Sequence, residues 1–273
     1  KRLIMKFKDK VVLITGGTSG IGRIMARMAC ERGARWVIVW GTRQQKIDDT
    51  VAELTAQGYN VAGHSVDVSD AKAVEMAYIN LRAAHGPVDI LINNAGVVTS
   101  NRTFDDYSVD EIDRTMDINS KAPMYVALQL LGEMVERDSG HICNIASAAG
   151  MIANPRMSVY VASKWAVIGW SESMRIELKQ RRSNVRVTTV APYYINTGMF
   201  DGVRSPILPI LEPEATARKI IRAIERNKDF KGIPLGFHLI RLAQGLLPTS
   251  WFEFIFGRCF GIFSTMDNFK GRK

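Results

Sequence analysis

The sequence predicts an α/β protein built on one doubly wound parallel sheet, for three reasons. Strand-like and helix-like segments alternate from Lys10 onward. The strand-like segments are short, apolar and rich in β-branched residues, as in strands that are buried on both faces. A glycine-rich turn follows the first strand and opens a helix. This alternation is typical of a Rossmann-like sheet with helices on both faces.

Each element has a local signal. Gly33 and Gly58 end the first two helices, Ser69 or Asp70 is a helix-capping residue, and Pro213 stands near the first turn of the last regular helix. About seven strands are expected, at 10–15, 35–40, 60–68, 88–96, 140–147, 184–192 and 230–235. Helices are expected at 21–33, 43–57, 70–85, 108–118, 120–137, 158–181 and 212–227.

No linker or internal repeat divides the chain before residue 236. We therefore expect residues 1–235 to form one dinucleotide-binding and catalytic domain. Residues 236–273 form an apolar helical extension, which includes the aromatic segment SWFEFIFGRCFGIF. The sequence leaves two roles open for this extension: packing against the protein body or a partner subunit, or peripheral contact with a membrane surface.

Composition excludes several classes of protein. With 47% hydrophobic and 23% charged residues, the 273-residue chain has the composition of a folded globular protein. The three cysteines and four histidines are scattered without metal-ligand spacing, so we predict no metal and a reducing, cytoplasmic location. No secretory signal or transmembrane helix is predicted.

The charge of +9 is concentrated at the two ends of the chain. Residues 1–10 carry five Lys or Arg and one Asp, and residues 231–273 carry six Lys or Arg and two Asp or Glu. This distribution argues against a nucleic-acid partner, whose binding face is usually basic throughout. Basic ends beside apolar helices suit an anionic membrane surface, or they serve only solubility.

The octet TGGTSGIG at 15–22 lies between the first strand and its helix. Glycines allow a tight turn and let backbone N–H groups approach a phosphate, and the helix N-terminus adds positive potential. The sequence therefore predicts a dinucleotide site formed by Gly16, Thr18, Ser19, Gly20, Ile21 and Gly22.

The end of the second strand usually selects the cofactor, because an acidic side chain there binds the adenosine ribose and repels a 2′-phosphate. Gly41 stands at about that position, and Arg43 follows. The missing carboxylate and the nearby guanidinium favour NADP(H) over NAD(H). The alternative is that Arg43 is only a solvent-exposed residue at the start of a helix.

Two further segments end at the carboxyl edge of the sheet, where dinucleotides bind. Asn94, Ala95 and Gly96 follow the fourth strand and either form a turn or hold strands and cofactor together. Asp67, beside Val68, follows the third strand and either accepts from the adenine amino group or forms an Asx turn.

Ser147, Tyr160 and Lys164 are expected to meet at the same edge. Ser147 ends the fifth strand, and Tyr160 and Lys164 lie one helical turn apart at the start of a long helix. A nearby ammonium favours the phenolate and lowers the pKa of a tyrosine, which suits general acid–base catalysis. Ser147 is placed to hydrogen-bond the substrate oxygen, so Ser147 and Tyr160 are the predicted substrate contacts.

These motifs resemble the short-chain dehydrogenase/reductase family over about residues 8–235. TGGTSGIG, NNAG, Ser147 and YVASK agree with that family in type, order and spacing. The resemblance implies that Asn119 completes a proton-relay tetrad with Ser147, Tyr160 and Lys164. It also implies that the segment with Pro192, Ile195 and Thr197 binds the nicotinamide carboxamide, although Tyr193 replaces a usual glycine.

The segments ASAAG, PILEPE, LLPTSWFEFIFG and MDNFKGR resemble the lipid-associated branch that includes 17β-hydroxysteroid and epidermal retinol dehydrogenases. This resemblance implies hydride transfer between NAD(P)(H) and an apolar alcohol or ketone, in a homodimer or homotetramer. The alternatives are a 3-oxoacyl-thioester reductase acting on an acyl carrier and a non-catalytic NADP-binding regulator. A complete set of Asn119, Ser147, Tyr160 and Lys164 argues against the regulator.

Overall fold

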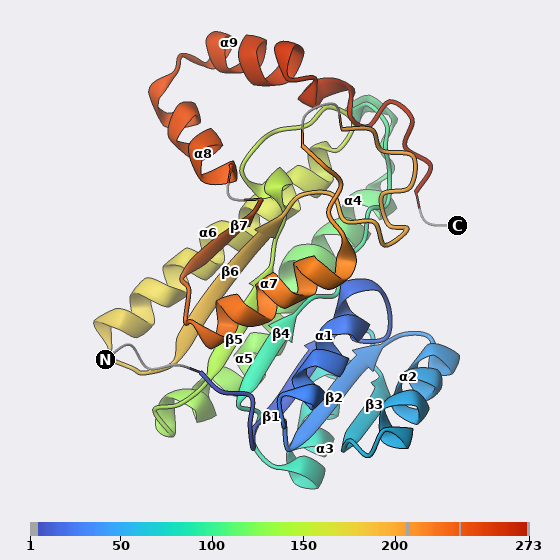
Figure 1. The fold of residues 1–273 in the computed structure, drawn as a ribbon, viewed down its shortest axis with the longest axis vertical. Coiled ribbons are helices and arrows are strands. Elements are labelled where there is room, and N and C mark those ends of the chain that lie inside the picture. Colours follow the sequence, from blue (N-terminus) through green and yellow to red (C-terminus); the bar gives the residue numbers. More distant parts are fainter. Residues whose placement is uncertain (1–4, 206–207, 235, 272–273) are drawn as a thin grey trace.

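A computed structural model describes residues 5–205, 208–234 and 236–271, with the backbone alone for 237–239 and 241. Within these residues seven parallel strands form one sheet in the order β3-β2-β1-β4-β5-β6-β7, which confirms the predicted fold class (Figure 1). The chain reverses its direction of winding between β1 and β4, which opens a crevice at the carboxyl edge. The strands are β1 Val11–Thr15, β2 Trp36–Gly41, β3 Val61–Ser65, β4 Ile90–Asn93, β5 His141–Ile145, β6 Arg186–Pro192 and β7 Phe230–Ile233.

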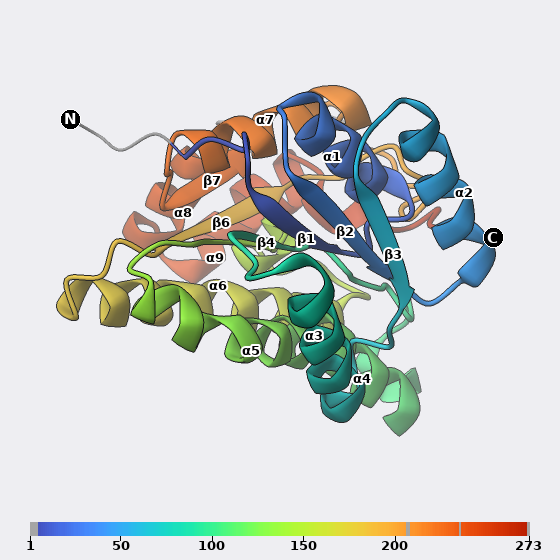
Figure 2. The ribbon, with the colours of Figure 1, turned by 90° about the horizontal axis from the view of Figure 1, so that it is seen from below.

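Helices cover both faces of the sheet (Figure 2). On one face α1 and α7 pack together through buried residues such as Met25 and Ile220. On the other, Leu130 and Met174 belong to a second buried cluster beneath α3, α5 and α6. The first layer is α1 Gly20–Glu31, α2 Gln44–Ala56 and α7 Pro213–Glu225; the second is α3 Ala71–His85, α4 Val109–Met116, α5 Ala122–Glu136 and α6 Ser158–Gln180.

The two helices expected at 108–118 and 120–137 are one continuous helical path. α4 and α5 are joined by a π turn at Asp117–Lys121. Pro123 explains why the sequence predicts two helices, because proline is typical of a first helical turn. It also explains the π turn, because proline has no N–H to donate to the carbonyl oxygen of Asn119. The helix widens there instead of ending.

The apolar extension packs against the sheet end that carries β5, β6 and α6. Ile240 and Phe252 share a buried cluster with Ala146, Val167 and Ile168. Outward-facing Leu246 is 74% exposed and Trp251 is 64% exposed. The extension contains α8 Phe237–Leu246, α9 Thr249–Phe252, a π turn at Glu253–Cys259 and a short 3-10 turn at Ile262–Ser264. No helix in the described part of the chain is long and apolar enough to cross a membrane.

Candidate active site

The glycine turn between β1 and α1 leaves no room for side chains. Gly16 and Gly20 have φ values of 63° and 54°, in the left-handed region that glycine adopts without strain. A Cβ on Gly22 would lie 2.2 Å from the carbonyl oxygen of Gly16. The turn therefore presents bare backbone at the N-terminus of α1, which is the environment that a phosphate requires.

Asn94 fastens this turn to the end of β4. Its Nδ2 donates to the carbonyl oxygens of Thr15 and Gly16, at 3.1 Å each. The Thr15 hydroxyl accepts from the backbone N–H groups of Asn94 and Ala95 at 3.0 and 3.1 Å. The NNAG segment thus holds neighbouring strands together, one of its two expected roles. Thr15 was not singled out in the sequence, although it ends the strand before the turn.

A cavity of about 130 Å³ joins most of the expected site residues. Gly22 and Asn119 do not line it; Gly22 sits behind the turn and Asn119 is fully buried. The expected residues on its wall are Gly16, Ser19, Gly20, Ile21, Asn94, Ala95, Gly96, Ser147, Tyr160, Lys164, Pro192, Ile195 and Thr197.

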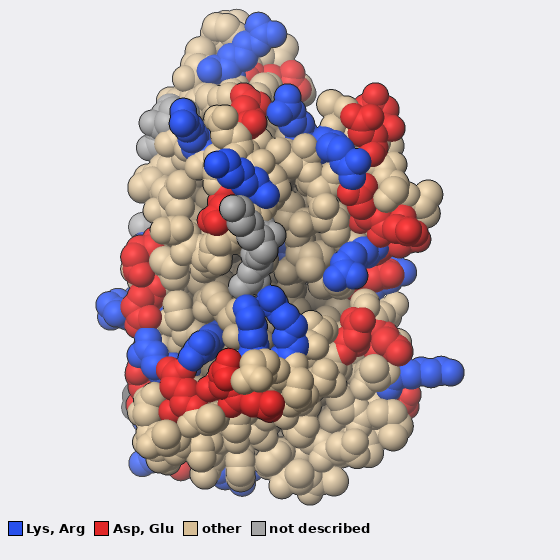
Figure 3. Space-filling model, turned by 90° about the vertical axis from the view of Figure 1, so that its right-hand side faces the viewer, with Lys and Arg blue, Asp and Glu red and all other residues tan. Residues whose placement is uncertain are grey.

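A larger hollow of about 500 Å³ continues from Gly16 past the end of β2. A Cβ on Gly41 would lie 2.9 Å from the Thr18 hydroxyl, so an acidic residue there would have to displace Thr18. The remaining expected residues on this wall are Thr18, Gly41, Arg43, Asp67 and Val68. Figure 3 shows Lys and Arg side chains interspersed with groups of Asp and Glu side chains on the face seen from the right of Figure 1.

Arg43 and Asp67 both lie on the wall of the hollow. Arg43 is the exposed residue that precedes α2, and it also lines the hollow. One Asp67 carboxylate oxygen accepts from the Ser69 N–H at 3.0 Å and from its hydroxyl at 2.6 Å, which forms the Asx turn. Arg114 of α4 lines the opposite wall and carries no sequence signal that would have identified it. Within the described residues, Arg43 and Arg114 have no ion pair with a carboxylate.

Tyr160 and Lys164 point toward the crevice from the first two turns of α6. They are 6% and 5% exposed, and the Lys164 ammonium lies 5.8 Å from the centroid of the Tyr160 ring. Lys164 Nζ donates to the carbonyl oxygen of Ile145 at 3.2 Å, and the Ser147 hydroxyl accepts from the Ala149 N–H at 3.2 Å. The three side chains from β5 and α6 thus meet on one wall.

The sequence predicts that the pKa of Tyr160 is lowered, but in the structure it is raised. Burial raises the pKa of the Tyr160 phenol to about 12, and a hydrogen bond with Ser147 only partly opposes it. Burial lowers the pKa of the Lys164 ammonium to about 8. Both shifts have one cause, because an apolar surrounding disfavours the charged form of either group. The Lys164 ammonium does not offset the effect of burial on the pKa of Tyr160.

Asn119 lies behind the site, in the π turn. Its Oδ1 accepts from the Val97 N–H at 2.8 Å, while Nδ2 donates to the Val97 carbonyl oxygen at 2.9 Å and to Ser163 Oγ at 3.1 Å. A Cβ on Gly96 would lie 3.3 Å from Asn119 Oδ1 and 3.6 Å from Lys164 Nζ. Asn119 therefore holds the loop after β4 against α6, next to Lys164.

An aromatic wall covers Tyr160 on the side away from the glycine turn. The ring centroid of Phe200 lies 6.0 Å from that of Tyr160 and 5.0 Å from that of Tyr194, edge-on in both cases. Met157 and Met266 complete the cluster. A narrow cavity of about 40 Å³ lies between this wall and Ser147. Phe200 lies in the loop GMFDGVRSPILPIL at 198–211, which the sequence predicts to line or cover the substrate pocket, and Tyr194 lies in the segment with Pro192, Ile195 and Thr197.

Segments distant in the sequence are joined across this wall. Tyr194 Oη and Asn154 Nδ2 both lie 3.1 Å from the Thr265 hydroxyl, and Asn101 Nδ2 donates to the Met266 carbonyl oxygen at 2.9 Å. The extension thus lies against the aromatic wall, and its Ile262 lines the narrow cavity beside Ser147.

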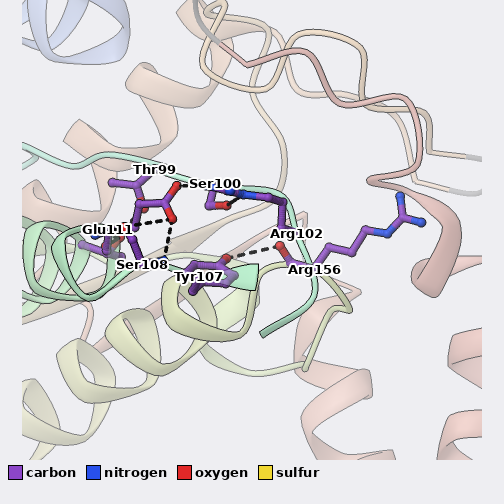
Figure 4. A network of polar contacts seen from close by, with 8 residues as sticks. Thr99, Ser100, Arg102, Tyr107, Ser108, Glu111 and Arg156 are labelled. Carbon is purple, nitrogen blue, oxygen red and sulfur yellow. Dashed lines mark hydrogen bonds and ion pairs between the residues drawn. The ribbon is translucent and has the colours of Figure 1, made fainter. Parts of the chain in front are cut away.

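Figure 4 shows the polar contacts that hold the loop after β4 beside the aromatic wall. Glu111 accepts from the Ser108 N–H at 2.9 Å and pairs with Arg102, whose Nε donates to Ser100 Oγ at 3.0 Å. Tyr107 Oη donates to the Arg156 carbonyl oxygen at 3.3 Å. This network ties the loop both to α4 and to the segment before α6.

The crevice fits a nicotinamide dinucleotide. Bare backbone at the helix start can hold the pyrophosphate, the hollow past Gly41 can hold the adenosine half, and the wall with Tyr160 can face the nicotinamide half. Among the described residues, no three His, Cys, Asp or Glu side chains group closely enough to hold a metal ion.

Comparisons with known proteins agree with this geometry. Residues 10–207 match the short chain dehydrogenase family. Epidermal retinol dehydrogenase 2 of Mus musculus is 34% identical over 269 residues, covering 97% of this chain and 86% of that protein. Estradiol 17-beta-dehydrogenase 11 of Homo sapiens is 28% identical, covering 88% and 79%.

Solved structures show the same fold. A metagenomic short-chain oxidoreductase in complex with NADP has a TM-score of 0.72 and 28% identity, covering 83% of this chain and 96% of that chain. An actinorhodin polyketide ketoreductase with NADPH has a TM-score of 0.77 and 27% identity, covering 85% and 99%. With its motifs, fold and crevice in agreement, the chain belongs to the short-chain dehydrogenase family and is an NAD(P)-dependent oxidoreductase.

Proposed function

We propose that this protein interconverts an apolar alcohol and its ketone or aldehyde, with NADP(H) as the favoured cofactor. The observation that carries the proposal is the single crevice in which the glycine turn, the Ser147–Tyr160–Lys164 wall and an aromatic cluster meet. The names of the retinol and estradiol dehydrogenases that it resembles support a retinoid-like or steroid-like substrate.

Tyr160 is the proposed proton donor or acceptor. When bound, the nicotinamide ring supplies or accepts the hydride. The Tyr160 phenol then exchanges a proton with the substrate oxygen, and the Ser147 hydroxyl hydrogen-bonds that oxygen and orients it. Because burial alone raises the pKa of Tyr160, we expect the added positive charge of an oxidised nicotinamide to lower it.

Lys164 and Asn119 support this step. Lys164 keeps a positive charge within 5.8 Å of the Tyr160 ring centroid, and its amine can reach a ribose hydroxyl at the same wall. Asn119 fixes Val97 and α6 beside Lys164, and we propose that it takes part in passing the proton onward.

NADP(H) is favoured because cations, and no carboxylate from β2, flank the adenosine end. Gly41 ends β2 without a side chain, and Arg43 and Arg114 face the hollow from opposite walls. A guanidinium binds a 2′-phosphate through paired N–H donors. The acidic residues Asp110 and Asp113 line the hollow on the same helix as Arg114 and weaken the preference for NADP(H). We therefore expect measurable activity with NAD(H) as well.

A substrate panel tests the proposal. Steroid and retinoid alcohols and ketones are assayed by nicotinamide absorbance with each cofactor, alongside acetoacetyl thioesters. Turnover of the lipids supports the proposal. The second candidate, an acyl-thioester reductase, rests on the likeness to a polyketide ketoreductase, and turnover of thioesters alone would replace the first proposal by it. Cofactor binding without turnover of any compound would indicate a non-catalytic regulator.

Peripheral membrane contact through the extension is a further part of the proposal. Leu242, Leu246, Trp251, Phe254 and Phe260 are exposed, and Arg258 lies among them. Exposed aromatic and aliphatic residues with a nearby cation suit the headgroup region of an anionic bilayer. Flotation with anionic vesicles should therefore recruit the protein, and Trp251→Glu with Phe254→Glu should abolish recruitment without reducing cofactor affinity. Recruitment of the double variant to the same extent would contradict this part.

We also propose that the protein forms a homodimer or homotetramer through exposed apolar residues of α5 and α6. Leu128 of α5 and Trp165 and Ile176 of α6 are large apolar side chains that stand exposed on that face. A second copy of the chain would cover them. Light scattering should give at least twice the monomer mass, and Leu128→Glu should reduce it; a monomeric wild type would overturn this part.

A further inference from the structure

A pocket outside the crevice is lined almost entirely by cations. Lys219 and Arg222 come from the C-terminal half of α7, Arg226 is its C-cap residue, Lys228 comes from the following turn and Lys231 from β7. They surround a hollow of about 190 Å³, which is also lined by Ala223. α7 and β7 lie side by side at the edge of the sheet, apart from the residues that line the crevice (Figure 1).

The five charges are not neutralised by the protein. Glu225 and Asp229 are the acidic residues nearest in sequence, and they pair with Arg32 at 2.7 Å and with Arg175 at 3.8 Å. In the described ranges, no ion pair joins any of the five cations to a carboxylate. Burial, followed by repulsion from Lys219, Lys228 and Arg226, lowers the pKa of Lys231.

The helix dipole explains only part of this arrangement. Cations near a helix C-terminus are stabilised by its free carbonyl groups, which accounts for Arg222 and Arg226. It does not account for Lys231, which comes from the adjacent strand and points into the same hollow. Positive charges converging from separate elements repel one another, so the arrangement is favourable when an anion occupies the hollow.

The N-terminal segment adds to the positive potential. The backbone N–H of Met5 donates to the carbonyl oxygen of Glu225 at 3.0 Å, which places exposed Lys6 close to the end of α7. Lys6 therefore adds a further positive charge near the pocket.

We propose that the α7–β7 pocket, defined by Lys219, Arg222, Arg226, Lys228 and Lys231, binds a phosphate monoester. A tetrahedral dianion offers acceptors in several directions, matching ammonium and guanidinium donors that converge from several sides. The hollow is less than half as large as the one beside Gly41, so it suits a phosphate with a small attached group. The group belongs either to a soluble metabolite or to a phospholipid headgroup.

The test compares two variants that lose equal charge. Lys219→Gln, Arg226→Gln and Lys231→Gln together remove three of the five positive charges of the pocket. Lys72→Gln, Lys179→Gln and Arg181→Gln together remove three exposed cations elsewhere. Calorimetric titration with glycerol 3-phosphate, at fixed ionic strength and with saturating NADP⁺, should show binding that weakens at least about tenfold in the pocket variant only. Equal binding by the wild type and the pocket variant, or no binding by the wild type, overturns the site.

A second arm identifies the source of the phosphate. Vesicles of phosphatidylcholine with and without phosphatidic acid are offered to the same three proteins. Recruitment that requires phosphatidic acid and is lost only in the pocket variant supports a lipid headgroup; glycerol 3-phosphate binding without such recruitment supports a soluble phosphate. Thermal unfolding checks the fold, and the pocket variant should melt no lower than the control variant because it relieves repulsion. None of these readouts requires turnover, so they stand whether or not the proposed activity is found.

Discussion

The cofactor end and the substrate end of the crevice are built in different ways. At the cofactor end, the bare backbone of the glycine turn and ties such as Asn94 to Thr15 and Gly16 come from the ends of the neighbouring strands β1 and β4. At the proposed substrate end, Tyr194 and Phe200 from the segment after β6 pack together, and Tyr194 contacts Thr265 of the extension. The first end is fixed by the sheet itself, whereas the second depends on how the extension packs. Substrate choice can therefore change while the cofactor site stays the same.

The largest expected effect lies where the two ends meet. Tyr160→Phe should reduce kcat by about a thousandfold, because general acid–base catalysis of this kind contributes about 10²–10⁴-fold. The dissociation constant for NADP(H), measured by fluorescence titration, should change little.

The matched control is Tyr194→Phe, which removes a hydroxyl from the same aromatic wall. That hydroxyl contacts Thr265 and Asn154 and is not proposed to exchange a proton with substrate. A similar loss of kcat in both variants would show that the phenols act only through packing.

The next largest effect separates the cofactors. Arg43→Ala should raise the dissociation constant for NADP(H) by about tenfold or more and leave that for NAD(H) nearly unchanged, since a charge-assisted contact to phosphate contributes about 1.5–3 kcal/mol. Gln44→Ala, the next exposed residue along α2, is the control. Equal weakening of both cofactors would mean that Arg43 does not contact a 2′-phosphate.

The third prediction tests whether the substrate end is independent. Phe200→Ala should change kcat/KM for a steroid or retinoid by roughly tenfold, because the gain or loss of apolar contact in a pocket is worth about 1–3 kcal/mol. The affinity for NADP(H) should remain within experimental error. Phe104→Ala, an exposed aromatic outside the crevice, should alter neither quantity. Loss of cofactor affinity in the Phe200 variant would contradict the division into two ends.

The same division explains what could be predicted from the sequence. The residues at strand ends, from Gly16 to Thr197, are predictable because a parallel sheet brings all its carboxyl ends to one edge. The predicted direction of the Tyr160 pKa is wrong, since spacing shows the nearby Lys164 but not the burial that dominates. That burial comes from Phe200 and Met266, whose positions depend on long-range packing. Residues 206 and 207 of the loop at 198–211, which the sequence predicts to line or cover the substrate pocket, lie outside the described residues.

The smallest expected effect concerns Lys164, which both ends share. Burial lowers its pKa in the folded protein to about 8, from 10.5. Between these two pH values the unfolded chain binds more protons than the folded one, so the cost of the buried ammonium is relieved as pH rises. From pH 8 to pH 9, the free energy of unfolding of the wild type should rise by about 1 kcal/mol relative to Lys164→Met. Urea denaturation at each pH measures this difference, with Lys179→Met as the exposed control. A difference that is constant with pH would mean that Lys164 keeps its charge through a partner at the cofactor end, and burial could then no longer be the shared cause of the Tyr160 and Lys164 pKa shifts.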